Sequence, residues 1–404
     1  MEIGTLADAG KLTGTVLLRV DFNSPIDPSS NQILDDKRFR EHLPTVQALE
    51  DSRLVVMTHQ SRPGKKDYTT LEAHAAKLER LLGRPVTYVD DIFGRCAREA
   101  VLNAKRGDVL MLENLRFAAE ENLTLKPEEA KKTILVRKLA SMADIYVNDA
   151  FGTAHRSQPS IVGLPLALPS VAGLLMEKEI RNLSRVFTGA PRPVTFVLGG
   201  TKVDDSIAVA KNVLERGIAD RVIVVGVVGN VFLLAAGYDI GRPSTQLIEQ
   251  LGYLGEVDKA KDLLETYRDR IFLPHSVAVR EGDRRAEYTV DAIPEEAQVL
   301  DLASESIDLL SREISRSGTV VVNGPAGLFE EEQFAVGTYS LLKAASTVEF
   351  SVVGGGHSAV AIERLGLEDR FSHISTGGGA AIEFLTGKKL PAIEALEMSR
   401  EIFG

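Results

Sequence analysis

Short apolar runs alternate with longer amphipathic segments along the first half of the chain. The runs are rich in β-branched residues and show no clear apolar–polar alternation, which is typical of parallel strands buried on both faces. They lie at residues 16–20, 54–57, 86–89, 109–112 and 145–147. Between them lie helical patterns such as residues 71–82, which Gly83 closes as a C-cap. This order of elements predicts a doubly wound α/β sheet.

The second half of the chain repeats this architecture without repeating the sequence. Its expected strands are residues 194–198, 222–225, 320–322 and 350–353, and a helical stretch at about 172–187 would link the halves. The predicted fold class is therefore α/β, with two doubly wound parallel-sheet domains joined by a helix and a cleft between them. We expect the first domain to comprise residues 1–171 with the C-terminal tail 388–404. The second would comprise residues 172–387, including the linking helix.

Composition and charge narrow the class of protein. A chain of 404 residues is too long for one ordinary core, and 44% hydrophobic with 26% charged residues is typical of globular domains. The net charge of −10, from 47 basic and 57 acidic residues, argues against nucleic acid as a partner. The longest apolar run is shorter than the roughly 20 residues of a membrane helix. The single cysteine, Cys96, favours a reducing compartment, so we expect a cytoplasmic protein without membrane contact.

Polar and basic residues follow the expected strands of the first half, where parallel-sheet proteins bind their ligands. They are Asp21, Asn23, His59, Arg62, Asn114, Arg116, Asn148, Asp149 and, a little further on, Arg156. The planar fork of arginine suits bidentate contact with phosphate and carboxylate, so this edge is expected to bind a small phosphorylated acid. Asp21 and Asn23 would accept hydrogen bonds from a substrate hydroxyl.

Each of these residues also has an ordinary structural interpretation. Asp21 and Asn23 precede Pro25, where turn chemistry is common. Arg38 lies in a charged helical segment and is typical of a solvated helix face, while Arg116 and Arg156 are typical of surface ion pairs. Their joint placement at strand ends favours the functional interpretation over each ordinary one.

Glycine follows the expected strands of the second half. The glycine-rich loops lie at residues 199–202, 226–230, 323–327, 354–357 and 377–379. Glycine lets backbone N–H groups approach phosphate closely, and a helix N-terminus adds partial positive charge, so these loops predict a nucleotide site. The sequence lacks the P-loop pattern and has no Gly-x-Gly-x-x-Gly after its first strand. Lys202 opposes the dipole of the helix it would open, which favours a functional role.

The remaining reactive residues are expected to be structural. His42, His74 and His275 would be surface or helix residues, and Cys96 lies in a helical pattern. The spacing of histidine and cysteine predicts no structural metal site.

Seven motifs, in order along nearly the whole chain, together resemble the phosphoglycerate kinase family. They are residues 19–23 (RVDFN), 59–63 (HQSRP), 112–117 (LENLRF), 148–156 (NDAFGTAHR), 198–203 (LGGTKV), 323–325 (NGP) and 375–379 (STGGG). The resemblance implies an N-terminal domain for 3-phosphoglycerate or 1,3-bisphosphoglycerate and a C-terminal domain for ATP or ADP with its Mg²⁺. It also implies that residues 390–404 pack on the first domain.

Residue roles follow from the resemblance. It implies phosphoglycerate contacts from Asp21, Asn23, Arg38, His59, Arg62, Arg116 and Arg156. It implies nucleotide contacts from Gly200, Lys202, Asn323, Pro325, Leu328, Glu330, Gly354, Gly355, Gly356, His357 and Ser358. The catalytic groups would be Arg38, Lys202 and the N–H groups of Gly377 and Gly378. Phosphoryl transfer needs positioning and charge stabilisation rather than a proton-abstracting base, which agrees with this set. Closure about the linking helix would bring the substrates in line and expel water.

The chain departs from the family pattern at two positions, in a way that resembles the archaeal branch. Ser206 stands where most members carry a second lysine, and His357 stands where they carry an aspartate that helps to hold Mg²⁺. Mg²⁺ is therefore expected to be carried by the nucleotide phosphates rather than by the protein.

Two other classes fit part of the sequence. Another kinase or ligase acting on a small acid would share the glycine loops but not the spacing of Asp21, Asn23, His59 and Arg62. A two-domain binding protein would close on one ligand and would give Lys202 no role. The pattern leaves a monomer and a homodimer equally open.

Overall fold

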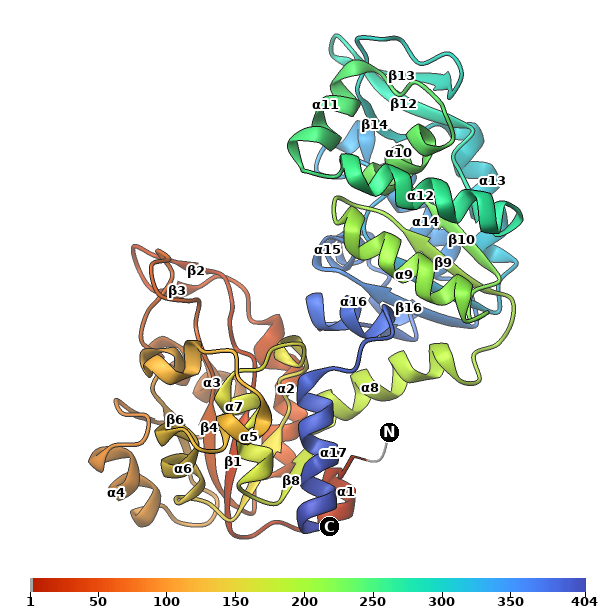
Figure 1. Ribbon diagram of the computed structural model, residues 1–404. Helices are drawn as coiled ribbons and strands as arrows, with labels where there is room; N and C mark the ends of the chain where they lie inside the picture. The colour runs from red at the N-terminus through yellow and green to blue at the C-terminus, as the bar shows by residue number, and fades with distance from the viewer. Residues whose placement is uncertain (1–2) are drawn as a thin grey trace. The chain divides into compact units, whose positions relative to one another are not determined.

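The computed structural model describes residues 3–404, which form two compact units. Unit 1 comprises the residues up to Arg181 together with Lys389–Gly404, and unit 2 comprises Asn182–Lys388. Each unit contains its own six-stranded sheet (Figure 1). In the part of the chain that is described, no helix is long and apolar enough to cross a membrane.

The sheet of unit 1 is entirely parallel, with the strand order β5-β6-β4-β1-β7-β8. Its strands are β1 (Thr15–Arg19), β4 (Arg53–Met57), β5 (Thr87–Val89), β6 (Val109–Leu112), β7 (Ile145–Asn148) and β8 (Ser170–Ala172). A small antiparallel pair, β2 (Ile26–Asp27) and β3 (Gln32–Ile33), lies outside it. All five side chains of β1 are buried, as expected of a central strand covered on both faces.

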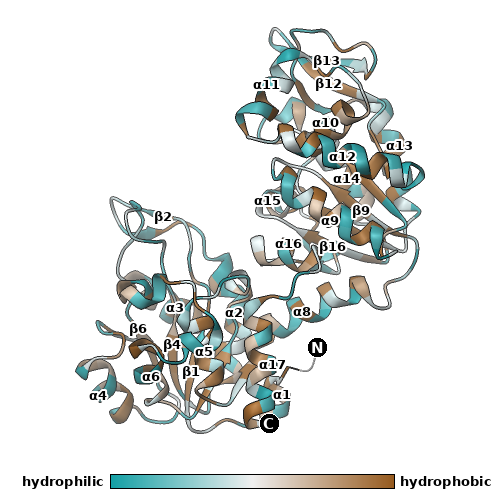
Figure 2. Cartoon of the chain, in the orientation of Figure 1, coloured by the Kyte–Doolittle hydropathy of each residue, from teal (hydrophilic) through white to brown (hydrophobic). Residues whose placement is uncertain are grey.

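Helices cover both faces of this sheet. They are α1 (Leu6–Ala9), α2 (Lys37–Ala48), α3 (Glu72–Leu82), α4 (Arg95–Asn103), α5 (Pro127–Ala130), α6 (Ile134–Ala140) and α7 (Pro159–Val162). Alternate residues of β1 belong to two separate cores. Val16 and Leu18 pack in a core with residues of α2 and α3, whereas Leu17 packs in a core with residues of α4 and α6. The apolar strands lie inside this layer arrangement and the polar helix faces lie outside (Figure 2).

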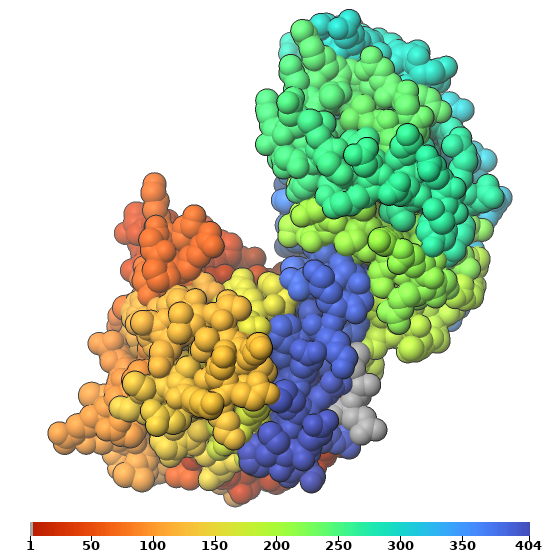
Figure 3. Space-filling view, in the orientation of Figure 1, coloured from red at the N-terminus to blue at the C-terminus, as the bar shows by residue number. Residues whose placement is uncertain are grey.

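The C-terminal helix belongs to unit 1. α17 (Pro391–Phe403) packs against α7, β8 and the short 3₁₀ turn Leu164–Leu166. The amide of Ala392 donates to the carbonyl of Ala154 at 3.0 Å. Figure 3 shows α17 lying along the unit 1 surface. The end of the chain therefore adds a helix to the first unit.

The main sheet of unit 2 is also parallel, with the order β11-β10-β9-β15-β16-β17. Its strands are β9 (Val194–Leu198), β10 (Arg221–Val224), β11 (Ile271–Phe272), β15 (Thr319–Asn323), β16 (Phe350–Gly354) and β17 (His373–Ile374). A second, antiparallel sheet has the order β13-β12-β14, built from β12 (Ser276–Glu281), β13 (Arg284–Thr289) and β14 (Val299–Leu302).

The helices of unit 2 bury both faces of its parallel sheet. They are α9 (Val203–Glu215), α10 (Gly226–Ala235), α11 (Arg242–Gln250), α12 (Leu254–Tyr267), α13 (Ser304–Ser315), α14 (Val336–Ala345), α15 (Gly356–Leu365) and α16 (Gly379–Leu385). Val197 of β9 packs in a core with residues of α13 and α14, and its neighbours Phe196 and Leu198 are buried as well. α8 (Leu174–Phe187) carries the chain from one unit into the other.

The predicted α/β class with two parallel sheets is confirmed. The linking helix expected at about residues 172–187 corresponds to α8, which begins at Leu174, because Ala172 ends strand β8 and pairs with β7. The sequence analysis also missed the short outer strands β8, β11 and β17 and the whole antiparallel sheet. Strands of two or three residues are too short to show a period. The strands of the antiparallel sheet are longer, but β13 (RRAEYT) is highly charged and has no buried position, so it forms no apolar run.

Candidate active site

The carboxyl end of β1 places a buried carboxylate beside an arginine of α2. Asp21 is 4% exposed, and its Oδ2 accepts a hydrogen bond from Nη1 of the half-buried Arg38. Burial alone would raise the pKa of Asp21, but the positive charge of Arg38 and its neighbours outweighs burial and lowers that pKa. Asp21 is therefore a carboxylate at neutral pH and orients Arg38 at this edge.

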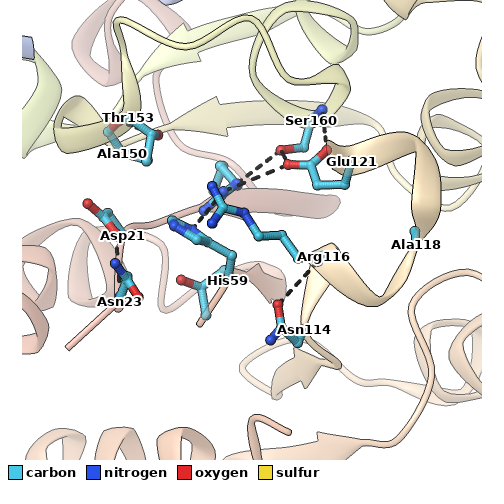
Figure 4. A network of polar contacts seen from close by, with 12 residues as sticks. Asp21, Asn23, His59, Asn114, Arg116, Ala118, Glu121, Ala150, Thr153 and Ser160 are labelled. Atoms are coloured by element: carbon cyan, nitrogen blue, oxygen red, sulfur yellow. Dashed lines mark hydrogen bonds and ion pairs between the residues drawn. The ribbon is translucent and has the colours of Figure 1, made fainter. Parts of the chain in front are cut away.

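The end of β4 brings His59 to the same edge. His59 is 1% exposed, and its Nδ1 lies 3.2 Å from Nη2 of Arg19, which is also buried. Burial first, and then the Arg19 charge, lower the pKa of His59 well below its ordinary value. His59 is therefore a neutral imidazole at physiological pH. Figure 4 shows His59 between Asp21 and Arg116.

Three further arginines of the predicted set, Arg62, Arg116 and Arg156, lie close enough to this edge for charges there to affect pKa values. Burial, together with the charges of Arg156 and Arg19, lowers the pKa of Arg116 to about 10. Burial also lowers the pKa of Arg156; the Asp21 carboxylate opposes this effect, and Arg19, Arg38 and the exposed Arg62 reinforce it. The arginines at this edge outnumber Asp21 and Glu121, the carboxylates that offset them. Such a cluster attracts an anion.

The loop after β4 fixes the positions of Asn23 and Arg116 through hydrogen bonds to its backbone. Ser61 has a left-handed backbone, with φ of 56°, although it is not glycine. Its amide donates to Oδ1 of Asn23 at 2.8 Å, and its carbonyl accepts from the guanidinium of Arg116. Strained backbone of this kind persists only where the surroundings fix it, and such positions cluster at functional sites. Asn23, which was expected to contact substrate directly, thus also fixes this loop.

His42 was expected to be an ordinary surface or helix residue. It does lie in a helix, α2, but it is 2% exposed and joins the site to α8. Its Nε2 accepts from the amide of Asp21 at 3.1 Å, so its Nδ1 carries the proton and donates to Oδ2 of Asp149 at 2.7 Å. Oδ1 of Asp149 accepts from the amide of Leu175 at 2.9 Å, in the first turn of α8. No local sequence signal could have revealed this link.

His74 and His275, which were also expected to be surface or helix residues, differ in burial. His74 lies in α3 and is fully buried, with its Nε2 at 3.1 Å from Oε1 of Gln60. Burial lowers the pKa of His74 to about 4. His275 is exposed. Cys96 is a free, exposed cysteine in α4.

Unit 2 contains a pocket of about 290 Å³ at the carboxyl ends of its parallel strands. Five residues from the predicted nucleotide set line it: Gly200, Pro325, Leu328, Glu330 and His357. One wall comes from β12 and β14 of the antiparallel sheet, through residues such as Val277 and Leu300. The sequence analysis missed this wall because it did not predict that sheet. A largely apolar cleft of this size with few polar groups is typical of a small-ligand site.

Two glycine loops of unit 2 interlock beside the pocket. The amide of Gly199 donates to the carbonyl of Asn323 at 2.8 Å, and the amide of Gly200 donates to that of Pro325 at the same distance. Gly324 has φ of +90°, and a Cβ added there would lie 2.3 Å from the carbonyl oxygen of Gly199. Only glycine fits at this crossing. The residues of these loops are thereby held at one edge of the sheet.

Helix starts supply the remaining predicted residues of unit 2. Gly354 ends β16, Gly355 precedes α15 with φ of +89°, and Gly356 opens that helix. Ser358 is buried, and its Oγ accepts from the amide of Gly324 at 3.2 Å.

The final glycine loop and Lys202 also lie at helix starts. Gly377 and Gly378 lie just before α16, and Lys202 is exposed at the start of α9. Lys202, Asn323, Gly354–Gly356, Ser358, Gly377 and Gly378 are outside the pocket lining.

The two departures from the family pattern have different surroundings. His357 is exposed, and its ring centroid lies 5.8 Å from that of Phe329. Ser206 is fully buried in α9, and its hydroxyl has no hydrogen-bond partner among the described residues. Within residues 3–404, no group of three or more His, Cys, Asp or Glu side chains is arranged to hold a metal ion.

A basic edge on one parallel sheet and a pocket beside glycine loops on another are typical of a two-substrate phosphotransferase of the α/β class. The profile of the family described as phosphoglycerate kinase matches residues 7–388, so the chain belongs to the phosphoglycerate kinase family.

Individual relatives agree over the full length. The chain is 66% identical to the phosphoglycerate kinase of Methanocorpusculum labreanum over 404 residues, covering 100% of both chains. It is 50% identical to phosphoglycerate kinase 2 of Methanosarcina acetivorans, over 95% of this chain and 92% of that one. The crystal structure of phosphoglycerate kinase from Pyrococcus horikoshii has a TM-score of 0.92 at 42% identity, covering 99% of this chain and 100% of that chain. The protein is accordingly a phosphotransferase with a carboxyl group as acceptor, using ATP or ADP with Mg²⁺, and resembles the archaeal enzymes.

Proposed function

We propose that the basic edge of unit 1 binds 3-phosphoglycerate or 1,3-bisphosphoglycerate and that the pocket of unit 2 binds ATP or ADP. The observation that carries the first assignment is the placement of the half-buried Arg116 and Arg156 near the buried His59 and Asp21. Burial also lowers the pKa of both arginines. A phosphate and a carboxylate supply the negative charge that this cluster lacks, and arginine binds both in a bidentate way. Asn23 and Asp21 would accept from the hydroxyl of the acid.

For the nucleotide we propose a division between the pocket and the glycine loops. Pro325 and Leu328 would contact the base, and Glu330 would accept from the ribose hydroxyls. The phosphates would lie at the start of α15, where Gly356 opens a helix whose first N–H groups have no intrahelical partner. Mg²⁺ would be bound mainly by the phosphate oxygens and water.

The transfer itself requires charge stabilisation and alignment. The carboxylate of 3-phosphoglycerate attacks the γ-phosphorus, the bond to the bridging oxygen of ADP breaks, and the products are 1,3-bisphosphoglycerate and ADP. We assign charge stabilisation to Arg38 from the acid side, and to Lys202 with the amides of Gly377 and Gly378 from the nucleotide side. No proton needs to be removed, since the attacking group is already a carboxylate.

The location of the two sites on separate units has a mechanistic consequence. In-line transfer requires the substrates to meet, so we propose that the units close during turnover and that closure excludes water from the acyl phosphate. We further propose that the enzyme works in the cytoplasm, as a monomer or homodimer.

Substitution of Arg38 tests this assignment. With ATP, Mg²⁺ and 3-phosphoglycerate in a coupled assay, Arg38→Ala is expected to lower kcat by about 10²- to 10³-fold, the loss typical of one charge-stabilising group. Arg40→Ala is the matched control, because Arg40 lies on the same helix but is exposed and pairs with Asp36. The control should stay within about twofold of wild type. A folded Arg38→Ala enzyme with wild-type kcat would overturn the assigned role.

A further inference from the structure

A buried polar chain lies directly behind His59. Nε of Arg19 donates to Oγ of Ser160 at 3.1 Å, and Oγ of Ser160 donates to Oε1 of Glu121 at 2.5 Å. Nη2 of Arg19 lies 3.9 Å from the same Glu121 oxygen and 3.2 Å from Nδ1 of His59. Arg19 and Glu121 are 2% and 1% exposed. Figure 4 shows Ser160, Glu121 and His59 in this arrangement.

The guanidinium of Arg19 restricts which nitrogen of His59 carries the proton. A guanidinium has only donors, so the Nδ1 that faces it must present its lone pair. A neutral imidazole with an acceptor at Nδ1 carries its proton at Nε2. The doubly protonated ring is disfavoured as well, because it would direct an Nδ1–H and a positive charge at the guanidinium.

The Nε2 atom of His59 is a buried donor left without a partner. Among the described residues, Nε2 is buried and makes no hydrogen bond. A buried donor is costly to leave unpaired, so such an atom at the edge of an anion site calls for an acceptor from the ligand. The arginines of this edge already supply positive charge. His59 adds a single directional donor.

We propose that Arg19 is a positioning residue, braced by Ser160 and Glu121, that fixes His59 in the neutral Nε2–H form. In this form His59 recognises the substrate through one hydrogen bond donated to a substrate oxygen, and not as a cation. This proposal rests on the proposed binding of 3-phosphoglycerate at the edge that carries Asp21 and Arg116. The identity of the protonated nitrogen can nevertheless be tested without any substrate.

The first test reads the tautomer in the free enzyme. Two-bond ¹H–¹⁵N correlation spectra of ¹⁵N-labelled protein distinguish the two neutral forms and the imidazolium, and the chain has only 7 histidines. The His59 signals are assigned by their loss in His59→Gln. A neutral ring protonated at Nε2 at pH 7 is expected. A ring protonated at Nδ1, or an imidazolium, overturns the proposal.

The second test compares two amide replacements of His59. A glutamine side chain can place an N–H donor near the position of Nε2, whereas asparagine can keep an acceptor towards Arg19 but supplies no donor at Nε2. We expect His59→Asn to raise KM for 3-phosphoglycerate about tenfold more than His59→Gln, with the KM for ATP unchanged in both. Equal effects, or a larger effect of His59→Gln, contradict the proposed donor. If neither variant changes KM for 3-phosphoglycerate, the substrate assignment of this edge fails even where the spectrum shows Nε2–H.

The third test addresses Arg19 itself. Arg19→Lys keeps a charge but loses the fixed fork of donors, so the spectrum should show a new population of His59 protonated at Nδ1. A folded Arg19→Lys protein in which His59 remains wholly in the Nε2–H form would remove Arg19 from the proposal. Ser160→Ala is the milder companion variant, because it removes one brace and leaves the guanidinium in place. It should shift the same equilibrium in the same direction, and an unchanged spectrum would argue against bracing.

Discussion

Replacement of His42 by alanine should destabilise unit 1 well beyond an ordinary helix substitution. The imidazole donates to Asp149 at 2.7 Å and accepts from the amide of Asp21 at 3.1 Å, and all of these groups are buried. Its ring also makes an edge contact with Phe22, with centroids 5.6 Å apart. Removing the ring therefore leaves a buried carboxylate and a buried N–H each short of a partner.

The expected loss is about 3–5 kcal/mol of unfolding free energy. A hydrogen bond to a charged group contributes about 1.5–3 kcal/mol, and an orphaned buried amide costs about 1–3 kcal/mol. The aromatic contact adds about 0.5–1.5 kcal/mol. Together these contributions span about 3–7.5 kcal/mol, and the lower part of that span agrees with the roughly 3–5 kcal/mol seen when one member of a buried pair is removed. It is a large part of the roughly 5–15 kcal/mol that stabilises a typical protein.

The assay combines chemical denaturation with amide hydrogen exchange. Because the chain has two units, a single transition cannot be assumed, and exchange reports on each site separately. The amides of Asp21, Leu175 and Met176 should lose protection in His42→Ala, since the first donates to His42 and the others to Asp149. His275→Ala is the control, because His275 is exposed, and its effect should stay within about 0.5 kcal/mol. A loss below about 1 kcal/mol in His42→Ala, with protection unchanged at the three amides, would refute this reasoning.

Two further outcomes follow from buried groups elsewhere. Burial lowers the pKa of His74 to about 4. Between pH 6.5 and 4 the unfolded chain therefore binds more protons at this residue than the folded chain does. The unfolding free energy falls as the pH falls through this window, by about 3 kcal/mol at pH 4. His74→Gln should flatten the curve of unfolding free energy against pH in that window, and parallel curves for the two proteins would contradict the assignment. Gly324→Ala should raise KM for ATP at least about tenfold, because its Cβ would collide with the Gly199 carbonyl. The control is Gly252→Ala, where φ is +79° and the space is open. This control should lower the unfolding free energy by about 1 kcal/mol and leave KM unchanged. Equal kinetic effects in the two glycine variants would show that the strained backbone, and not the collision, matters.

Much of the fold was readable from local patterns. The apolar runs at 54–57 and 350–353 correspond to β4 and β16 within one residue at either end, because strands buried on both faces leave a continuous apolar signal. The prediction that His59 and Gly354–Gly356 serve in binding rests on the same regularity, because parallel-sheet proteins bind ligands where their strands end. The two-residue strands and the β12–β14 sheet gave no comparable signal.

What the sequence by itself determined is therefore the layered α/β class, the main strands and the residue types that follow them. Tertiary structure alone decided which groups those residues contact. His42 and His59 are both histidines at one edge, yet the amide of Asp21 makes Nε2 of the first an acceptor, while Arg19 makes Nδ1 of the second an acceptor. The wall of the unit 2 pocket formed by β12 and β14 was likewise decided by folding. The physical reason is range: strand and helix signals arise from neighbours in the chain, whereas a tautomer or a pocket wall depends on groups that meet only after the chain has folded.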